Sequence, residues 1–287
     1  MRLKQFFNLI WNEFIYGGHL LSLGAVSIVY TSAILLNIKI TWDFLVIVYL
    51  GIYCPYLYNR YKEFNKDFLT NPERTKHLKG FIKYIPIIIA FSLIVIVGIF
   101  LYFNKITALL FAIFLLLLSL SYSILFKKLS RKIIGFKSFY ASLAWTLLLI
   151  LLAIYYSYSL KNFPLIVLSV FFYLRFFIGT GFCDIKDIET DKRDGLLTLA
   201  VVLGRKNLLN ILNLVNILTI IPIIIGVYFR LIPPYSLMLL LSVPYSFYYF
   251  KKSEQINVNT NFLYNVLVDG ELISWSIFVL LGRFLLW

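Results

Sequence analysis

The chain has 287 residues, of which 61% are hydrophobic, 18% aromatic and only 14% charged, with a formal net charge of +14. A soluble globular domain carries about 25% charged residues, so the composition excludes an ordinary soluble protein. The apolar runs are long enough to cross a bilayer core of about 30 Å and do not alternate, which predicts an all-α polytopic membrane protein and excludes a transmembrane β-barrel.

The chain begins with an amphipathic stretch, residues 1–17, which we expect to lie along the membrane interface with Trp11 and Tyr16 as anchors. The apolar runs that follow predict nine transmembrane helices in a single domain that covers residues 1–287. Their ranges are 18–36, 42–58, 82–103, 107–126, 138–159, 164–183, 208–229, 233–250 and 262–286.

The basic residues alternate between the two sides of these helices. Most of the 27 lie before the first helix or in the second, fourth, sixth and eighth connections. The opposite side carries only Lys39, Lys105, Lys161, Arg230 and Arg283. The positive-inside rule therefore predicts a multi-pass protein of the cell membrane with a cytoplasmic N-terminus and an external C-terminus. Because the excess positive charge follows this orientation, it does not indicate binding to nucleic acid.

A first acidic cluster follows the second predicted helix, in "NRYKEFNKD" (59–67). Asn59, Glu63 and Asp67 are spaced four residues apart. If the helix continues past the membrane surface, the three side chains lie on one face.

A second acidic cluster follows the sixth predicted helix, in "DIKDIETDKRDG" (184–195). Asp184, Asp187 and Asp191 also share one helical face. Asn59 and Asp184 are 125 residues apart with four predicted helices between them, which suggests two similar four-helix halves followed by a ninth helix. A mixed-charge loop alone is usually a solvated surface, but two acidic stripes at helix ends on the cytoplasmic side indicate a shared site.

The chemistry of this site favours a hard divalent cation. Carboxylate oxygens without His or Cys suit Mg²⁺, which keeps several waters and bridges carboxylates to phosphates. Basic residues are interleaved with the acids, as a phosphate group would require. The sequence therefore predicts that the carboxylates hold Mg²⁺ and that the metal holds a diphosphate.

These motifs resemble those of the UbiA-type intramembrane prenyltransferases, whose two signatures are N-x-x-x-D-x-x-x-D and D-x-x-x-D. The segment "DIKDIETDKRDGLLTLAVVLGRKN" (184–207) is similar to the second signature and its tail, and "NRYKEFNKD" is similar to the first. One departure is Glu63, where the family usually has Asp; its extra methylene moves the ligand oxygen by about 1.5 Å. The segments 71–80 and 122–145 also resemble the family, and the likeness extends over nearly the whole chain.

The resemblance implies a bundle around a central cavity, in which two Mg²⁺ ions bind the diphosphate of an isoprenoid donor at the cytoplasmic end. The catalytic residues that it implies are Asn59, Glu63, Asp67, Asp184, Asp187 and Asp191, and the metal ligands among them are Glu63, Asp67, Asp187 and Asp191.

The diphosphate is expected to contact basic residues near the motifs, namely Arg60, Arg74, Lys128, Lys137, Lys186 and Arg193. Tyr122, Tyr140 and Trp145 are candidates to face the prenyl group and its allylic cation, although an aromatic residue in a membrane bundle more often only packs.

Three further charged residues lie within predicted helices, well away from the helix ends. Arg175 needs an acid or a phosphate as its partner, because an unpaired charge in the membrane interior is costly. Asp269 and Glu271 interrupt the last predicted helix. Asp269 could either pair with Arg175 or orient an acceptor, or the two acids could simply be solvated by a lateral opening.

The predicted function is Mg²⁺-dependent transfer of a polyprenyl group from an isoprenyl diphosphate to a lipophilic acceptor in the lipid bilayer. The acceptor is expected to be an aromatic ring of the quinone-precursor type, with ether-lipid or carotenoid prenyl transfer as alternatives. Glu63 and Arg60 leave open a non-catalytic isoprenoid-diphosphate binder with a degenerate first motif. Asp269 and Glu271 leave open a transporter.

Overall fold

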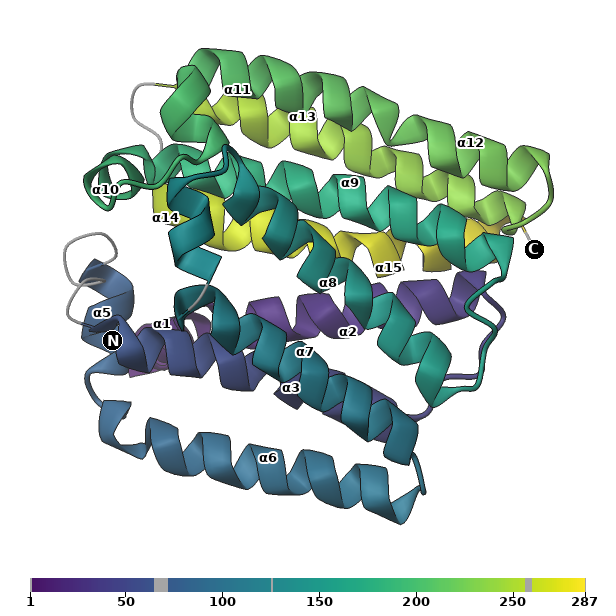
Figure 1. The fold of residues 1–287 in the computed structure, drawn as a ribbon, viewed down its shortest axis with the longest axis horizontal. Coiled ribbons are helices and arrows are strands. Elements are labelled where there is room, and N and C mark those ends of the chain that lie inside the picture. The colour runs from purple at the N-terminus through teal and green to yellow at the C-terminus, as the bar shows by residue number, and fades with distance from the viewer. Residues whose placement is uncertain (1, 65–71, 125, 256–259, 287) are drawn as a thin grey trace.

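In a computed structural model, residues 2–64, 72–124, 126–255 and 260–286 are described, and they form helices joined by short connections (Figure 1). The helices of the first half of the chain are α1 (Arg2–Tyr16), α2 (His19–Leu35), α3 (Trp42–Lys62), α5 (Pro72–Leu78), η1 (Ile82–Tyr84), α6 (Ile85–Tyr102), α7 (Ile106–Ile124) and η2 (Phe126–Arg131). The helices of the second half are α8 (Phe136–Tyr155), α9 (Phe163–Lys186), α10 (Ile188–Arg193), α11 (Leu199–Leu218), α12 (Ile220–Tyr228), η3 (Pro234–Leu241), α13 (Ser242–Ser253), α14 (Thr260–Phe262), the π-helical η4 (Leu263–Val268) and α15 (Asp269–Leu286).

Each of the nine ranges predicted from the apolar runs coincides with a helix or with successive helices. Among the described residues, five helical segments are long and apolar enough to cross a membrane by themselves: Ile82–Tyr102, Phe136–Tyr155, Phe163–Lys186, Leu199–Tyr228 and Leu263–Leu285. A sixth is added if α1 and α2, which form a bent pair, count as one span. The chain is an all-α polytopic membrane protein.

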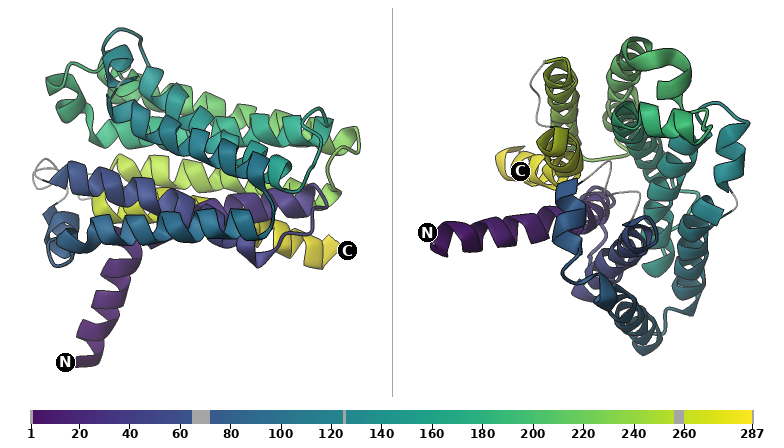
Figure 2. Two further views of the ribbon diagram at one scale, coloured as in Figure 1. Left: turned by 60° about the horizontal axis from the view of Figure 1, so that its bottom comes forward. Right: turned by 90° about the vertical axis from the view of Figure 1, so that its left-hand side faces the viewer.

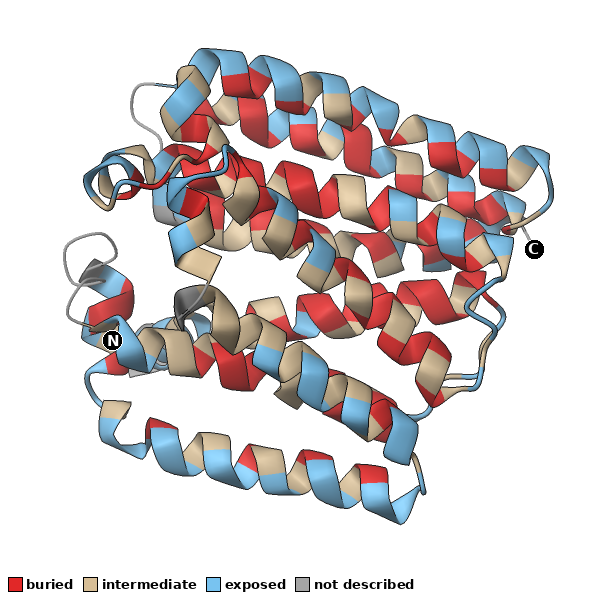
Figure 3. Cartoon of the chain, in the orientation of Figure 1, coloured by how far each residue is buried: buried red, intermediate tan, exposed pale blue. Residues whose placement is uncertain are grey.

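The outer surface of the bundle is apolar, as contact with lipid requires. On α6, for example, Ile87, Phe91 and Ile94 are 66%, 67% and 69% exposed. Figure 3 shows buried residues on the inward faces of the helices and exposed ones on the outward faces of α6, α11 and α12. An apolar surface of this extent is unfavourable in water and is stable in hydrocarbon.

The first long helix packs against the last. Helix α15 lies against α2, while α2 also packs on α3, and α3 on α6. On the other side of the bundle α8 packs on α9, and α9 on α11 (Figures 1 and 2). The described residues of both acidic motifs lie at the same end of the bundle, the left-hand end in Figure 1, where α5 and α10 lie.

The opposite end is built from tight turns of one kind. Asn37, Asn104, Ser157 and Arg230 all have a left-handed backbone, with φ of 55°, 53°, 54° and 55°. In each case the residue that follows the left-handed one donates a backbone hydrogen bond to the carbonyl five positions earlier in the chain. At Asn104, for example, Lys105 N donates to Phe100 O at 2.8 Å. This is the Schellman ending of a helix, which satisfies the last carbonyls and reverses the chain within a few residues.

Helix α1 leaves the bundle at an angle of 57° to α2, through Gly17 and Gly18 (Figure 2). Gly18 has a φ of 92°, and a Cβ there would lie 2.4 Å from the Tyr56 ring, so this bend requires glycine. Contacts with α5 hold α1 in place: His77 Nε2 is 2.7 Å from Glu13 Oε2, and the Tyr16 hydroxyl donates to Glu73 Oε2 at 2.7 Å.

Candidate functional site

The second acidic motif is folded around one ammonium group. Lys137 Nζ lies 2.8 Å from Asp184 Oδ1 and 3.0 Å from Asp191 Oδ2. The other Asp184 oxygen accepts a hydrogen bond from the Ser138 hydroxyl at 2.8 Å. Asp184 and Asp191 are both buried, so their charges need such partners. The two carboxylates thus converge on the Lys137 ammonium.

The motif is not one continuous helix. Helix α9 ends at Lys186, Asp187 lies at the junction with φ of −97°, and α10 begins at Ile188. The backbone nevertheless keeps a helix-like path across this junction, because Asp187 N donates to Asp184 O and Asp191 N donates to Asp187 O. Asp184 and Asp191 therefore still face the same side, although the predicted single helical stripe is interrupted.

A pair of backbone hydrogen bonds brings Lys137 to this motif. Leu197 N donates to Ser130 O at 2.7 Å, and Gly135 N donates to Leu197 O at 2.8 Å. The basic connection before α8 is thereby fixed to the segment that follows α10. Gly135, with φ of 72°, then starts α8, so that Lys137 lies in the first turn of this helix.

Burial has an electrostatic consequence at Asp191. It raises the pKa of this carboxyl above its ordinary value, against the opposing effect of the Lys137 ammonium. At the rim of the motif Lys127 Nζ contacts Asp194 Oδ2 at 2.8 Å, which is a half-exposed pair.

The first acidic motif lies at the end of α3. Asn59 and Arg60 are in the last turn of this helix, and the Arg60 guanidinium lies 5.1 Å from the centre of the Tyr56 ring. Helix α3 continues past the predicted end of the apolar run to Lys62, and the exposed Glu63 is its C-cap. Glu63 N still donates to Asn59 O, which keeps Glu63 one turn beyond Asn59. Asp67 lies outside the described residues.

The predicted diphosphate-binding residues differ in their surroundings. Lys137 contacts the second motif directly, Arg74 is buried on α5, and the Lys186 ammonium lies 5.5 Å from the centre of the Tyr264 ring. Lys128 and Arg193 are exposed.

The three aromatic candidates also differ in their surroundings. The Tyr140 hydroxyl donates to the Leu118 carbonyl at 2.6 Å, and the Tyr122 hydroxyl is 3.1 Å from Ser130 Oγ. Trp145 stacks on Phe176 and lines a cavity. Of the three, Trp145 is therefore the one whose ring is placed to meet a molecule in that cavity.

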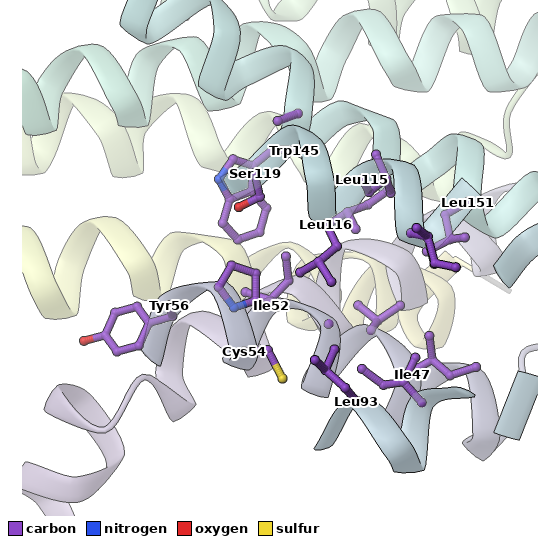
Figure 4. A pocket seen from close by; sticks show the side chains of 18 of the residues that line it. Ile47, Ile52, Cys54, Tyr56, Leu93, Leu115, Leu116, Ser119, Trp145 and Leu151 are labelled. Atoms are coloured by element: carbon purple, nitrogen blue, oxygen red, sulfur yellow. The ribbon is translucent and has the colours of Figure 1, made fainter. Parts of the chain in front are cut away.

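This cavity has a volume of about 330 Å³ and lies between α3, α6, α7 and α8 (Figure 4). Its end nearest the motifs is lined by polar groups, including those of Asn59 and Arg60. The rest is lined mainly by apolar side chains, such as Ile47, Leu116 and Leu151. A long apolar molecule with one charged end matches this distribution of polar and apolar groups.

Residues 20–266 match the UbiA prenyltransferase family, and this range includes both acidic motifs and the helices that line the cavity. The chain belongs to this family. It is accordingly an enzyme of the intramembrane prenyltransferase class.

Two solved structures have a similar fold. One is the apo structure of a UbiA homolog from Aeropyrum pernix K1, with 14% identity, a TM-score of 0.68, and coverage of 92% of this chain and 97% of the homolog. The other comes from a study of the biosynthesis of digeranylgeranylglyceryl phosphate synthase in membranes, with 17% identity, a TM-score of 0.59, and coverage of 97% and 98%. At these identities the likeness shows the fold alone. No curated protein matches the sequence.

UbiA-family enzymes generally depend on Mg²⁺. Within the described ranges, no three His, Cys, Asp or Glu side chains converge to hold a metal by themselves. The donor type nevertheless fits Mg²⁺, because the two motifs supply carboxylate oxygens and contain no His or Cys. Mg²⁺ usually takes one or two carboxylates and completes its shell with phosphate oxygens and water.

The structure identifies the partners of two charged groups of this UbiA-family enzyme, Arg175 and Asp269. Arg175 is paired with Glu271, and its guanidinium also donates to Asn216 Oδ1 and Ser246 Oγ, both at 2.5 Å. Asp269, the predicted alternative partner, instead interacts electrostatically with Lys186, Arg74 and Arg60. The sequence signal was the unpaired charge of Arg175, but the expected pairing of Arg175 with Asp269 is wrong, because Glu271 is the partner.

Proposed function

We propose that the protein catalyses Mg²⁺-dependent transfer of a polyprenyl group from an isoprenyl diphosphate to a lipophilic acceptor. The observation that carries this proposal is that both motifs share one neighbour. The Asp269 carboxylate is within electrostatic range of Arg60, from the first motif, and of Lys186, from the second. Arg60 also lines the polar end of the apolar cavity, which supports the proposal of one site shared by the two motifs and the cavity.

The donor diphosphate would bind at this region through Arg60, Arg74, Lys137 and Lys186, with Lys128 and Arg193 at its exposed side. The cavity would hold the isoprenoid tail and exclude water from the reacting carbon. The bond between the first carbon of the tail and the diphosphate oxygen breaks, and its electron pair leaves with the diphosphate. A nucleophilic atom of the acceptor then bonds to that carbon and loses its proton.

The proposed ligands of two Mg²⁺ ions are Glu63, Asp67, Asp187 and Asp191, with Asn59 and Asp184 supporting them. When bound with the diphosphate, the ions would neutralise the charge that develops on the leaving group. Trp145 at the cavity wall supports the proposal that an aromatic face shields the allylic cation. The Tyr122 and Tyr140 hydroxyls are engaged with Ser130 and with the Leu118 carbonyl.

We propose an aromatic acceptor of the quinone-precursor type. A second candidate is a glycerol-phosphate acceptor of ether-lipid synthesis, which the fold likeness to the digeranylgeranylglyceryl phosphate synthase structure favours. Incubation of the purified enzyme with geranylgeranyl diphosphate and each acceptor, followed by mass spectrometry of the lipid product, decides between the two.

The proposed topology has nine transmembrane helices in one domain of two four-helix halves and a ninth helix. The N-terminus, the interfacial segment 1–17 and both motifs are then cytoplasmic, and the C-terminus is external. The basic residues that surround both motifs support this orientation. Labelling of single cysteines introduced at Lys39 and Lys128 in intact cells tests it, because only the first would react with an impermeant reagent.

The test of the activity is diphosphate release and product formation by the wild type and by the variants Asp67→Ala and Asp191→Ala. Each variant should abolish turnover while the protein remains folded in detergent, as shown by size-exclusion chromatography. Mg²⁺ should be required for the wild-type reaction. Wild-type rates in either purified variant would exclude the assignment of the two motifs.

A further inference from the structure

An aromatic cluster lies beyond the deep end of the cavity that runs from the first motif into the bundle. The rings of Phe44 and Phe100 pack against Tyr155, with ring centres 4.8 and 6.0 Å apart. The Tyr155 hydroxyl donates to the buried carboxylate of Asp43. Phe44, Phe100 and Tyr155 are all nearly inaccessible, so these groups form a solid wall.

This wall lies one helical turn beyond the deepest residues that line the cavity. On α3, Phe44 is one turn from the cavity residues Ile47 and Val48. In the same way, members of the cluster lie four residues from cavity residues on the neighbouring elements: Phe100 from Ile96, Tyr155 from Leu151, and Lys105 from Leu109. The ammonium of Lys105 lies 5.2 Å from the centre of the Tyr155 ring. Because residues four apart lie on the same face of a helix, the cluster covers the end of the cavity from three helices.

The length of the cavity follows from the residues of α3 that line it, from Arg60 at the polar end to Ile47 at the deep end. The 13 residue steps from Ile47 to Arg60 extend over about 20 Å at a rise of about 1.5 Å per residue. An extended chain advances about 3.5 Å over three backbone bonds, so the four-bond repeat of an isoprenoid advances about 5 Å. The cavity therefore has the length of about four isoprene units.

Gly51 lies in the middle of this lining. It belongs to the stripe formed by Ile47, Gly51, Pro55 and Asn59, which are spaced by four residues along α3 and all line the cavity. A Cβ atom at Gly51 would have no atom within 4 Å. A larger side chain at this position would therefore enter the cavity about 12 Å from Asn59, the length of between two and three isoprene units.

We infer that the cavity limits the donor to a tail of about four isoprene units, and that Gly51 is the specificity-determining residue that keeps its deep half open. This inference rests on the proposed function, since it specifies the substrate of the same site. A shorter tail leaves part of the apolar cavity unfilled, and a longer one meets the wall formed by Phe44, Phe100 and Tyr155.

The test compares binding and transfer of geranyl, farnesyl, geranylgeranyl and hexaprenyl diphosphates by the purified full-length protein in detergent. Binding is measured without acceptor, so that no transfer occurs. The wild type should bind more tightly with each added unit up to geranylgeranyl diphosphate and gain nothing with hexaprenyl diphosphate. In Gly51→Leu, the affinity for geranylgeranyl diphosphate should fall at least about tenfold while that for geranyl diphosphate stays within about twofold.

Gly98→Leu is the matched control. A Cβ atom at Gly98 also has open space around it, and this glycine lies within α6 but does not line the cavity. It should leave the order of the four donors unchanged. Should Gly51→Leu fail to fold, Gly51→Ala serves instead, because alanine favours a helix over glycine by about 1 kcal/mol and should shift the same preference to a smaller extent.

Equal loss of affinity for all four donors in the folded Gly51 variant would overturn the inference. So would wild-type binding of hexaprenyl diphosphate that is tighter than that of geranylgeranyl diphosphate, because the tail would then leave the cavity between helices. A length-dependent binding profile without any transfer would support the inference and exclude the proposed function. Transfer that does not depend on tail length would support the proposed function and overturn the inference.

Discussion

The guanidinium group of Arg175 contacts the carboxylate of Glu271 inside the bundle and joins α9 to α15. Both side chains are almost completely inaccessible. Asn216 from α11 and Ser246 from α13 add hydrogen bonds to the same guanidinium. Four helices of the second half are therefore held together by one polar network, which lies within the apolar layer where unpaired charges are costly.

We predict that Glu271→Ala is strongly destabilising, because it leaves the Arg175 charge buried without its counterion. Loss of one member of a buried ion pair typically costs about 3–5 kcal/mol. Asp269→Asn is the control, since it removes a carboxylate two residues away and leaves the pair intact. Thermal unfolding of both variants in detergent checks this, and equal unfolding temperatures for the two would contradict it.

The Arg175 network could be predicted only in part from the sequence. The rule that a charge in the membrane interior needs a partner predicts an acid or a phosphate for Arg175, and Glu271 is this acid. Asp269 and Glu271 are only two residues apart, so they point to nearly opposite sides of α15 at about 100° per residue. Which of them faces Arg175 depends on the rotation of α15 about its own axis, and packing against α2 and η3 determines that rotation.

Lys137 offers a second prediction, because its ammonium joins the two buried carboxylates of the second motif. Lys137→Met should lower the rate of prenyl transfer by at least about 100-fold, as expected for the loss of a charged group that stabilises the leaving diphosphate. Lys161→Met, which removes an exposed lysine from the opposite end of the bundle, is the control. Initial rates at saturating Mg²⁺ check this. Similar rates in the two variants would show that Lys137 only neutralises the acids.

A third prediction concerns the stability of the fold at Asp191. Burial raises the pKa of this carboxyl above its ordinary value of 3.8, so the folded protein holds the proton more tightly than the unfolded chain. The contribution of Asp191 to stability is therefore present below about pH 4 and is lost as the pH rises through the folded pKa. Asp191→Asn, which carries no charge, should abolish transfer and yet unfold at no lower temperature than the wild type at pH 7.

The difference in unfolding temperature between wild type and Asp191→Asn should shrink as the pH falls toward about 4. Lys137 remains neutralised in this variant because Asp184 lies 2.8 Å from its ammonium. The measurement is thermal unfolding in metal-free detergent buffer across this pH range. A clear drop in the unfolding temperature of Asp191→Asn at pH 7 would show that the ion pair with Lys137 outweighs the cost of burial.

Much of the architecture could be predicted from hydropathy and charge, because long apolar runs and alternating basic connections are local properties of the sequence. The exact path of the chain at the two motifs could not. Helix α3 ends at Lys62 and the second motif bends at Asp187, whereas a fixed helical period predicts unbroken stripes. The contact of Lys137 with Asp184 and Asp191 likewise depends on the backbone bonds of Leu197 to Ser130 and Gly135, which no local pattern encodes.

Glu63 provides the last prediction, since it replaces the aspartate that the family signature has at this position. Glu63 is the exposed C-cap of α3, one turn beyond Asn59, and its carboxylate is therefore free to adjust its reach. Glu63→Asp should retain activity within about tenfold, because oxygen ligation is preserved and the shift of about 1.5 Å can be taken up by water in the Mg²⁺ shell. Glu63→Ala should raise the Mg²⁺ concentration needed for half-maximal rate, because one ligand is lost. Titration of the initial rate with Mg²⁺ for both variants checks this, and an inactive Glu63→Asp would show that the metal requires the longer side chain.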